Sequence, residues 1–359
     1  MQKPAAPTVS VIVRSMARPT LANALESIAA QDYPELEVLV VAACGATHPT
    51  LMERCGSHRM RLVASERPLS RPEAANAGLA SASGDWVTFL DDDDIWMPGH
   101  VTGLMAARAA APQARVVYSY AHAVFANGRI ERVGQPFSLI QLYERNFIHL
   151  SAAMIARGLI SDGCRFDESL EVLEDWDFFL QCAQRTAFHF VPRATFRWHA
   201  DIGTSGAGGD ANQHHARFAT FRGRIYAKFA SSREALIERV TALLQKATLS
   251  MRDGDFVSAE AACRDALHAS PNDPWALNVL AGVQGSSNRL ADARATMELA
   301  ASVRPEDPAI VYNLALLCLA MGDKAAAARH CGGVLKVEPG FAAAQELRAM
   351  LTAQGQAVS

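Results

Sequence analysis

The sequence lacks the features that mark membrane, disulfide-rich and nucleic-acid-binding proteins. No segment approaches the roughly 20 consecutive apolar residues that a membrane span needs, and the opening MQKPAAP has no apolar core of a signal peptide. The seven cysteines form no CxxC or zinc spacing, which indicates reduced thiols. A net charge of −3 offers no attraction for nucleic acid. We therefore expect a cytoplasmic protein whose membrane contact, if any, is peripheral at the inner membrane.

A run of four aspartates, Asp91 to Asp94, follows directly on the apolar stretch 86–90. Like charges at a strand end repel one another, and a folded protein keeps them together mainly when a cation neutralises them. Carboxylate oxygens suit Mg²⁺ or Mn²⁺, and Mg²⁺ is often shared with substrate phosphates. The run predicts a metal–diphosphate site at the carboxyl edge of a sheet. The alternative is a solvated acidic loop.

The first half of the chain alternates between β-branched apolar runs and amphipathic segments. Predicted strands cover 9–13, 37–41, 60–63 and 86–90, and predicted helices cover 19–30 and 71–81. This alternation favours an α/β fold with a parallel sheet and helices on both of its faces. Ligands of such sheets bind beyond the carboxyl ends of the strands. The acidic run lies at one of those ends.

The second half is rich in alanine and leucine, and several residue types recur in it with a period of 34 residues. The recurring residues are Pro271, Pro305 and Pro339, then Gly254, Asn288 and Gly322, and then Ala259, Ala293 and Ala327. The pattern resembles tetratricopeptide repeats (TPR), which implies an all-α solenoid. We expect about three repeats and a capping helix over 341–351. A domain boundary near residue 232 would separate 1–232 from 233–359.

Four stretches of the first half resemble family 2 glycosyltransferases of the GT-A fold. They are VSVIVRSMARPTLANALESIAAQDYPELEVLVV over 9–41, RPEAANAGLASASGDW over 71–86, FLDDDDIWMPGHV over 89–101 and FDESLEVLEDWDFFLQCA over 166–183. The resemblance extends from about Val9 to about Lys228. It implies an α/β domain with a Rossmann-like mixed sheet, followed by the TPR solenoid.

The resemblance also implies an activity, that of an inverting, metal-dependent bacterial glycosyltransferase. Such an enzyme moves a sugar from a nucleotide-diphosphate sugar to a glycan, lipid-linked or protein acceptor. Asp93 corresponds to the direct ligand of Mg²⁺ or Mn²⁺, and Asp91 to a residue that faces ribose or metal. Asp175 corresponds to the catalytic base. Glu174 and Asp177 remain alternatives, because acidic residues are favoured in the first turn of any helix.

Further residues are assigned to the donor site by the same resemblance. His199 precedes a Gly/Ser-rich loop, 203–209, and is expected to reach the metal or the diphosphate while the loop closes over the nucleotide. A structural histidine is the alternative for His199, and a solvated helix start is the alternative for Arg71 and Asn76. The expected nucleotide-sugar contacts are Arg14, Ser15, Arg71, Asn76, Asp91 and Asp92.

The sequence departs from the family pattern where the nucleobase is expected. The family usually carries an aspartate after the second strand, and here Ala42, Ala43 and Cys44 stand in its place. Ala17 also stands where asparagine is common. A base edge can then be met by backbone groups or by Ser15. The donor nucleotide and sugar therefore stay unassigned.

Three function hypotheses remain open. The first is the glycosyltransferase, whose repeats bind the acceptor or a partner protein, or only stabilise or dimerise the enzyme. The second is a non-catalytic scaffold that binds sugar nucleotides, which the missing nucleobase aspartate suggests. The third is a nucleotidyltransferase, which usually carries a glycine-rich loop after the first strand, whereas RSMARPT over 14–20 contains no glycine.

Overall fold

The computed structural model describes residues 6–200 and 215–353, and the chain divides into two compact units. One unit comprises Met1–Gln135 with Arg145–Lys228, and the other comprises Pro136–Glu144 with Phe229–Ser359. Helix α7 (His215–Arg252) passes through residue 232 without a break. A functional boundary at that residue stays a prediction.

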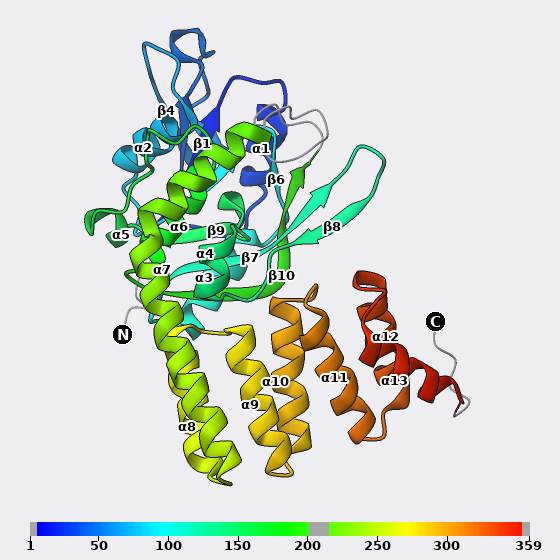
Figure 1. The fold of residues 1–359 in the computed structure, drawn as a ribbon. Helices are drawn as coiled ribbons and strands as arrows, with labels where there is room; N and C mark the ends of the chain where they lie inside the picture. The colour runs from blue at the N-terminus through cyan, green and yellow to red at the C-terminus, as the bar shows by residue number, and fades with distance from the viewer. Residues whose placement is uncertain (1–5, 201–214, 354–359) are drawn as a thin grey trace, which may run out of the picture. The chain divides into compact units, whose positions relative to one another are not determined.

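The first unit is built on a mixed ten-stranded sheet, shown in Figure 1. The strand order is β3-β4-β2-β1-β5-β9-β7-β10-β6, with β8 paired to β7. Strands β4, β2, β1 and β5 run parallel, whereas β9 is antiparallel to both of its neighbours. The expected Rossmann-like mixed sheet is confirmed. The strands are β1 (Val9–Ser15), β2 (Leu36–Ala42), β3 (Arg54–Cys55), β4 (His58–Val63), β5 (Trp86–Asp91), β6 (Ile95–Trp96), β7 (Ala114–Val124), β8 (Ile130–Val133), β9 (Ala153–Ala156) and β10 (Ala187–His199).

Helix α2 (Arg71–Ser81) has the bounds that the sequence predicts. The Ser70 side chain accepts a hydrogen bond from the Glu73 N–H, and the Glu73 carboxylate accepts one from the Ser70 N–H, which forms a capping box. Gly78 lets the helix approach β1 closely, because a Cβ there would lie 2.3 Å from Ile12 Cγ2. The other helical segments that lie wholly within this unit are α1 (Leu21–Ala29), η1 (Gly45–Thr47), α3 (His100–Ala110), η2 (Leu150–Ala152), α5 (Gly158–Ser161) and α6 (Glu174–Ala183).

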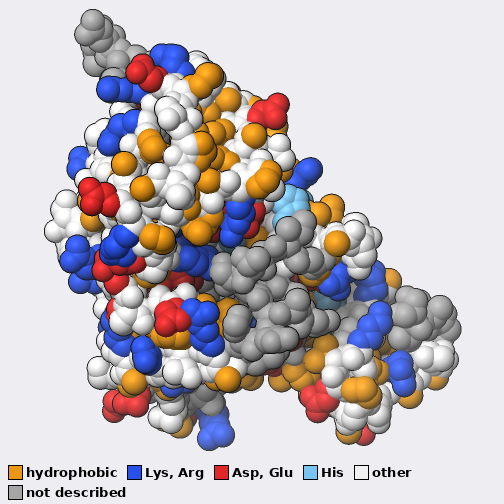
Figure 2. Space-filling model, turned by 90° about the horizontal axis from the view of Figure 1, so that it is seen from above, with side chains coloured by type: hydrophobic (Ala, Val, Ile, Leu, Met, Phe, Trp, Pro, Cys, Tyr) orange, Lys and Arg blue, Asp and Glu red, His pale blue; other side chains and the backbone are white. Residues whose placement is uncertain are grey.

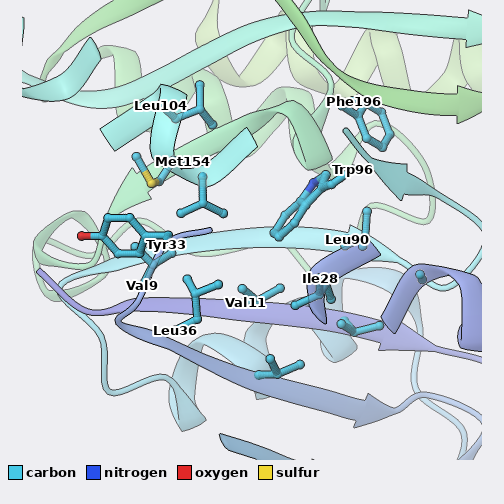
Figure 3. Packing of buried hydrophobic residues seen from close by; sticks show 14 of the residues in the cluster. Val9, Val11, Ile28, Tyr33, Leu36, Leu90, Trp96, Leu104, Met154 and Phe196 are labelled. Carbon is cyan, nitrogen blue, oxygen red and sulfur yellow. The ribbon is translucent and has the colours of Figure 1, made fainter. Parts of the chain in front are cut away.

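Figure 3 shows part of the hydrophobic core that supports the sheet. Val11 of β1 and Leu90 of β5 are completely buried in it. Ile28 of α1 and Leu104 of α3 belong to the same cluster and are also completely buried. Burying a side chain of this size stabilises the fold by roughly 1.5–3 kcal/mol. The core thereby fixes β5, whose carboxyl end carries the acidic run.

The parallel register brings residues from distant parts of the chain to one edge of the sheet. In the β1–β5 pair, Arg14 lies opposite Asp91 at the carboxyl ends of the two strands. In the β1–β2 pair, Ser15 lies opposite Ala42. The acidic run therefore begins beside an arginine that is 77 residues earlier in the sequence.

The second unit is helical, as Figure 1 shows. The bounds of its helices follow the 34-residue period. The turn residues Gly254, Asn288 and Gly322 have φ angles of 77°, 60° and 79°, in the left-handed region that glycine and asparagine tolerate best. The TPR architecture is confirmed, and the predicted capping helix is α13. After α7, the helices of this unit are α8 (Phe256–Ala269), α9 (Pro274–Ser286), α10 (Leu290–Val303), α11 (Pro308–Ala320), α12 (Lys324–Val337) and α13 (Ala342–Ala353), and the unit also contains α4 (Leu139–Glu144).

Two further repeated features explain why these helices begin and pack as they do. Aspartate side chains cap the first turns of four helices by accepting hydrogen bonds from backbone N–H groups. The periodic alanines are completely buried, so neighbouring helices can approach closely at these positions. The capping residues are Asp255, Asp273, Asp307 and Asp323, and the alanines are Ala259, Ala293 and Ala327.

Acidic and basic side chains are mixed on the molecular surface. On the face shown in Figure 2, Lys and Arg side chains lie among Asp and Glu side chains and hydrophobic ones. Such mixing agrees with the small net charge of −3. Within residues 6–200 and 215–353, no helix has both the length and the apolar character of a membrane span.

Candidate active site

A cavity of about 440 Å³ lies at the carboxyl ends of β1 and β5. Its lining holds five carboxyl groups and three guanidinium groups, an excess of two acidic groups. The polar lining residues are Arg14, Arg18, Arg71, Asp91, Asp93, Asp94, Asn146, His149, Glu174 and Asp175. The apolar and aromatic ones are Met16, Ala43, Leu69, Ala74, Val172, Leu173, Trp198 and Phe218.

Arg14 holds Asp91 in a two-point ion pair at the strand ends. The Arg14 Nε and Nη2 atoms lie 2.7 and 2.8 Å from the two carboxylate oxygens of Asp91. Nη1 donates to Glu174 Oε1 at 3.2 Å. Burial raises the pKa of Asp91, but the guanidiniums of Arg14 and Arg71 outweigh it and lower that pKa to about 2. Asp91 is therefore ionised throughout the physiological pH range.

Glu174 connects this ion pair to the start of α2. Its carboxylate is 1% exposed and lies 3.1 Å from Arg71 Nε as well as beside Arg14. Arg71 Nη2 also lies 3.8 Å from Asp91 Oδ2. Two cations and two carboxylates from β1, α2, β5 and α6 thus form one network. Glu174, which the sequence suggested as an alternative base, is thus paired with two arginines.

Three carboxylates of the acidic run form a cluster that suits a metal ion. One oxygen each of Asp91, Asp93 and Asp94 lie within 4.8 Å of one another. Burial and then the neighbouring carboxylates raise the pKa of both Asp93 and Asp94, because crowded like charges disfavour the ionised form. An all-oxygen donor set of this kind fits Mg²⁺ or Mn²⁺. The sequence named Asp91 and Asp93 for this role and missed Asp94, although it belongs to the same run.

Asp92, the fourth member of the run, turns away from this cluster. Its side chain is completely buried and accepts the backbone N–H of Met16 at 2.7 Å. It also pairs with the Arg18 guanidinium at 2.6 Å, and Arg18 in turn lies 3.1 Å from Asp93. Ala17, inside the same loop, has a φ of 57°, a left-handed conformation that asparagine adopts more readily. Asp92 therefore holds the loop after β1 and does not line the cavity.

His199 lies beside the acidic cluster at the end of β10. Its Nδ1 lies 3.2 Å from the backbone carbonyl oxygen of Asp93. Because a carbonyl oxygen only accepts, Nδ1 is the protonated nitrogen and donates a hydrogen bond to it. Nε2 is then the nitrogen that could act as a metal ligand. The group of possible ligand atoms within 4.8 Å of one another comprises Asp91, Asp93 and Asp94 and does not include His199. The predicted loop 203–209 lies outside the described residues.

Asp175 faces the same cavity from the first turn of α6. The helix begins after Leu173, whose φ of 64° makes a sharp entry. Asp175 Oδ1 accepts the N–H of Trp176 at 2.8 Å, and Oδ2 accepts from Asn146 Nδ2 at 3.1 Å. Burial and then the neighbouring Glu174 carboxylate raise the pKa of Asp175 to about 6. The group is thus ionised at neutral pH and close to the point of taking up a proton.

Asp177, the other alternative base, lies elsewhere. It is completely buried, accepts from Gln181 Nε2 at 2.6 Å and lies 2.7 Å from Lys228 Nζ. It does not line the cavity. Of the three acidic residues at the start of α6, only Asp175 combines exposure to the cavity with freedom from a salt bridge in the described contacts.

The structure does not bring Ser15 and Asn76 to the cavity. Ser15 is completely buried, and its hydroxyl is engaged by the Ala17 N–H at 3.0 Å and by His48 Nε2 at 2.9 Å. Asn76 bonds to both backbone groups of Phe166 and borders a separate cavity of about 210 Å³. Five helical residues from Arg71 to Asn76 turn the side chain by about 140°, which explains the separation.

Sequence reasoning also missed Asn146 and His149, which line the cavity from the segment before η2. His149 Nδ1 accepts the N–H of Ser151 at 3.3 Å, and burial lowers the pKa of His149 to about 4. The imidazole is therefore neutral. Neither residue lies in a recognisable motif, so the sequence carried no signal for them.

Comparisons with known proteins assign two regions of the chain to described families. Residues 10–164 match the family model described as "Glycosyl transferase family 2", and residues 250–304 and 286–351 match a tetratricopeptide-repeat model. The chain thus carries a family 2 glycosyltransferase domain followed by tetratricopeptide repeats.

Several bacterial proteins are similar to about half of the chain. It is 30% identical over 205 residues to the succinoglycan biosynthesis protein ExoO of Rhizobium meliloti, which covers 52% of this chain and 58% of that protein. It is 26% identical over 187 residues to an uncharacterized glycosyltransferase of Haemophilus influenzae, which covers 50% and 63%. The chain thus spans less than two thirds of the length of these two relatives.

Among solved structures, the crystal structure of S. aureus TarS shares 16% sequence identity with this chain at a TM-score of 0.49. The match covers 81% of this chain and 55% of that one. A likeness this distant carries no argument about function.

Proposed function

We propose that the chain is an inverting, metal-dependent glycosyltransferase that takes a sugar from a nucleotide-diphosphate sugar. The observation that carries the proposal is the one cavity that unites the cluster of Asp91, Asp93 and Asp94 with Arg71 and Asp175. Transfer from such a donor needs compensation of the diphosphate charge and a base for the acceptor hydroxyl. The cavity offers groups of both kinds.

Asp93 and Asp94 are the residues that would hold a divalent cation most directly. Asp91 contributes its charge, but Arg14 already engages both of its oxygens. His199 could add Nε2, because its other nitrogen donates to Asp93. When bound, the cation would neutralise the diphosphate and improve it as a leaving group.

Arg71 and Arg18 are the cations that would face the phosphates. Both line the cavity, and each already lies within 4 Å of a carboxylate of the acidic run. A guanidinium between a carboxylate and a phosphate can donate to both, because it has five N–H groups. Arg14 would act indirectly by fixing Asp91. We assign Asp92 and Ser15 to the shape of the loop after β1 and Asn76 to the support of the segment near Phe166.

Asp175 would remove the proton from the acceptor hydroxyl. A base is most effective when its pKa lies near the working pH, and a pKa of about 6 meets this condition. Attack by the activated hydroxyl on the side opposite the diphosphate would invert the configuration at the sugar carbon.

The acceptor is proposed to be a glycan, a lipid-linked glycan or a protein. Relatives of the domain are named for succinoglycan, colanic acid and amylovoran biosynthesis, and one is a glucosyltransferase acting on an undecaprenol-linked glycan. These names favour the first two acceptors. The repeats are proposed to dock the acceptor or a partner protein, since repeat surfaces commonly bind proteins. The prediction that the protein acts in the cytoplasm, with any membrane contact peripheral at the inner membrane, stays a prediction.

The test is a screen of UDP-, GDP- and dTDP-sugars with Mn²⁺ that measures release of the nucleoside diphosphate. Wild type should turn over at least one donor, and Asp175→Asn should not. Asp265→Asn changes an exposed aspartate of α8 in the same way and should behave as wild type. Binding of a nucleoside diphosphate with Mn²⁺ should also raise the melting temperature. Binding without any turnover would favour the non-catalytic scaffold.

A further inference from the structure

Asn146 lies in the cavity beside Asp175, and its two amide atoms have different partners. Nδ2 lies 3.1 Å from Asp175 Oδ2, and Oδ1 accepts the backbone N–H of Ile148 at 3.1 Å. We propose that Asn146 is a positioning residue that holds the Asp175 carboxylate in the orientation for taking the acceptor proton. This inference rests on the proposed role of Asp175 as the base.

The orientation of the Asn146 amide follows from its partners. A backbone N–H can only donate, so the amide oxygen must face Ile148. The amide nitrogen, which also only donates, must then face Asp175. Rotating the amide by half a turn would place two donors together at Ile148 and two acceptors together at Asp175. Each contact therefore reinforces the other.

Both oxygens of Asp175 are thereby held. Oδ1 accepts the N–H of Trp176 at 2.8 Å, and Asn146 supplies the donor at Oδ2 from 29 residues away. Each oxygen keeps a further lone pair for an acceptor hydroxyl. A carboxylate fixed in this way loses little freedom when the acceptor binds, which lowers the entropic part of the barrier. Without Asn146, the contact within α6 would be the one hydrogen bond left to the Asp175 carboxylate among the described residues.

An uncharged donor suits this position better than a cation would. A lysine or arginine at residue 146 would pair with Asp175 and lower its pKa, and a weaker base transfers the proton less effectively. An amide orients the carboxylate without that loss. Besides burial, Glu174 from α6 raises the pKa of Asp175, whereas Arg71 from α2 and Arg14 from β1 lower it. The other charged or titratable groups that line the same cavity are Arg18, Asp91, Asp93, Asp94 and the neutral His149.

Two variants separate positioning from folding. Asn146→Asp keeps an oxygen for the Ile148 N–H but loses the donor to Asp175 and adds a like charge. Asn146→Ala loses both contacts. The assay measures release of the nucleoside diphosphate in the presence of Mn²⁺, with water as the acceptor. Its substrate is the nucleotide sugar that wild type hydrolyses fastest in the screen.

We expect kcat to fall about tenfold or more in both variants, because small misplacements of reacting groups cost up to a hundredfold. The donor KM should stay within about twofold, because neither variant changes a group that we propose to bind the donor. In the profile of kcat against pH, the fall on the acidic side (the acidic limb) should move to higher pH in both variants, because the lost hydrogen-bond donor disfavours the ionised form of Asp175. The move should be larger in Asn146→Asp than in Asn146→Ala, because the added negative charge disfavours that form further.

The outcomes distinguish this inference from the proposed function. If Asn146→Asp melts like wild type and keeps its kcat and acidic limb, while Asp175→Asn is inactive, the inference is wrong and the proposed function stands. A fall in kcat with an unmoved acidic limb also contradicts it. Full activity of Asp175→Asn, or no release by wild type from any donor, would overturn the proposed function and this inference with it.

Discussion

Replacing Arg14 by methionine should weaken the folded protein and strengthen its affinity for a divalent cation at the same time. Arg14 is 6% exposed, and its guanidinium engages both oxygens of Asp91 and one of Glu174. Methionine is flexible, apolar and able to fill much of the same space. The variant therefore leaves two carboxylates short of one cation. Arg71 still faces both, at 3.1 Å from Glu174 and 3.8 Å from Asp91.

The size of the effect follows from the burial of this network. Removing one partner of a buried ion pair costs about 3–5 kcal/mol. Because Arg71 remains as a partner, we expect the lower end, about 3 kcal/mol of unfolding free energy without metal. Both oxygens of Asp91, which lie beside Asp93 and Asp94, would then be released from Arg14. A tenfold gain in Mn²⁺ affinity would return about 1.4 kcal/mol at saturating metal.

Urea unfolding in EDTA and in excess Mn²⁺ measures both parts of this prediction. The gain in stability from Mn²⁺ should be larger in Arg14→Met than in wild type. Arg264→Met is a suitable control, because Arg264 is 69% exposed and pairs only with Glu260 on its own helix among the ion pairs of the described residues. It should change neither value appreciably. An average substitution costs about 1 kcal/mol of unfolding free energy. A smaller loss in Arg14→Met, together with an unchanged response to Mn²⁺, would refute the proposed role of the Arg14–Asp91 ion pair.

Further predictions concern the metal, the base and the packing of α2. Asp93→Ala should abolish Mn²⁺-dependent binding of nucleoside diphosphates and leave the fold intact, because the cluster loses self-repulsion; equal affinity by calorimetry would contradict the metal site. Asp175→Asn should lower kcat about a hundredfold or more and spare donor affinity, as expected for a lost general base; wild-type turnover would place the base elsewhere. In wild type, kcat should fall as pH decreases through about 6, the pKa of Asp175, because only the ionised carboxylate accepts a proton; a flat pH profile down to about pH 4 would exclude this base. Gly78→Ala should cost about 1–3 kcal/mol in urea unfolding, because its Cβ would lie 2.3 Å from Ile12 Cγ2. Gly103→Ala, which has open space around it, should instead stabilise α3 by up to about 1 kcal/mol.

Local features of this protein could be predicted because neighbouring residues determine them. The start of α2 follows from the capping box of Ser70 and Glu73, which are three residues apart. The TPR solenoid follows from a period in which each unit packs on the next. The acidic run indicates a cation site because adjacent carboxylates repel one another wherever the chain folds.

The partners of the site residues were decided by the tertiary structure. Arg14 meets Asp91 because β1 and β5 pair in one register, and a shift by one residue would place Arg14 on the other face of the sheet. Asn146 reaches Asp175 although no motif surrounds it. Asn76, which resembles a donor-site residue in the sequence, faces another cavity because of its position on the α2 circumference.

The acidic run itself shows where sequence reasoning ends. Its four aspartates are chemically identical, and the sequence determined only that they crowd together. The turn after β5 sends Asp92 into the loop that contains Met16, while Asp91, Asp93 and Asp94 converge on one point. The path of the backbone sets these directions, and it depends on packing between segments that are far apart in the chain.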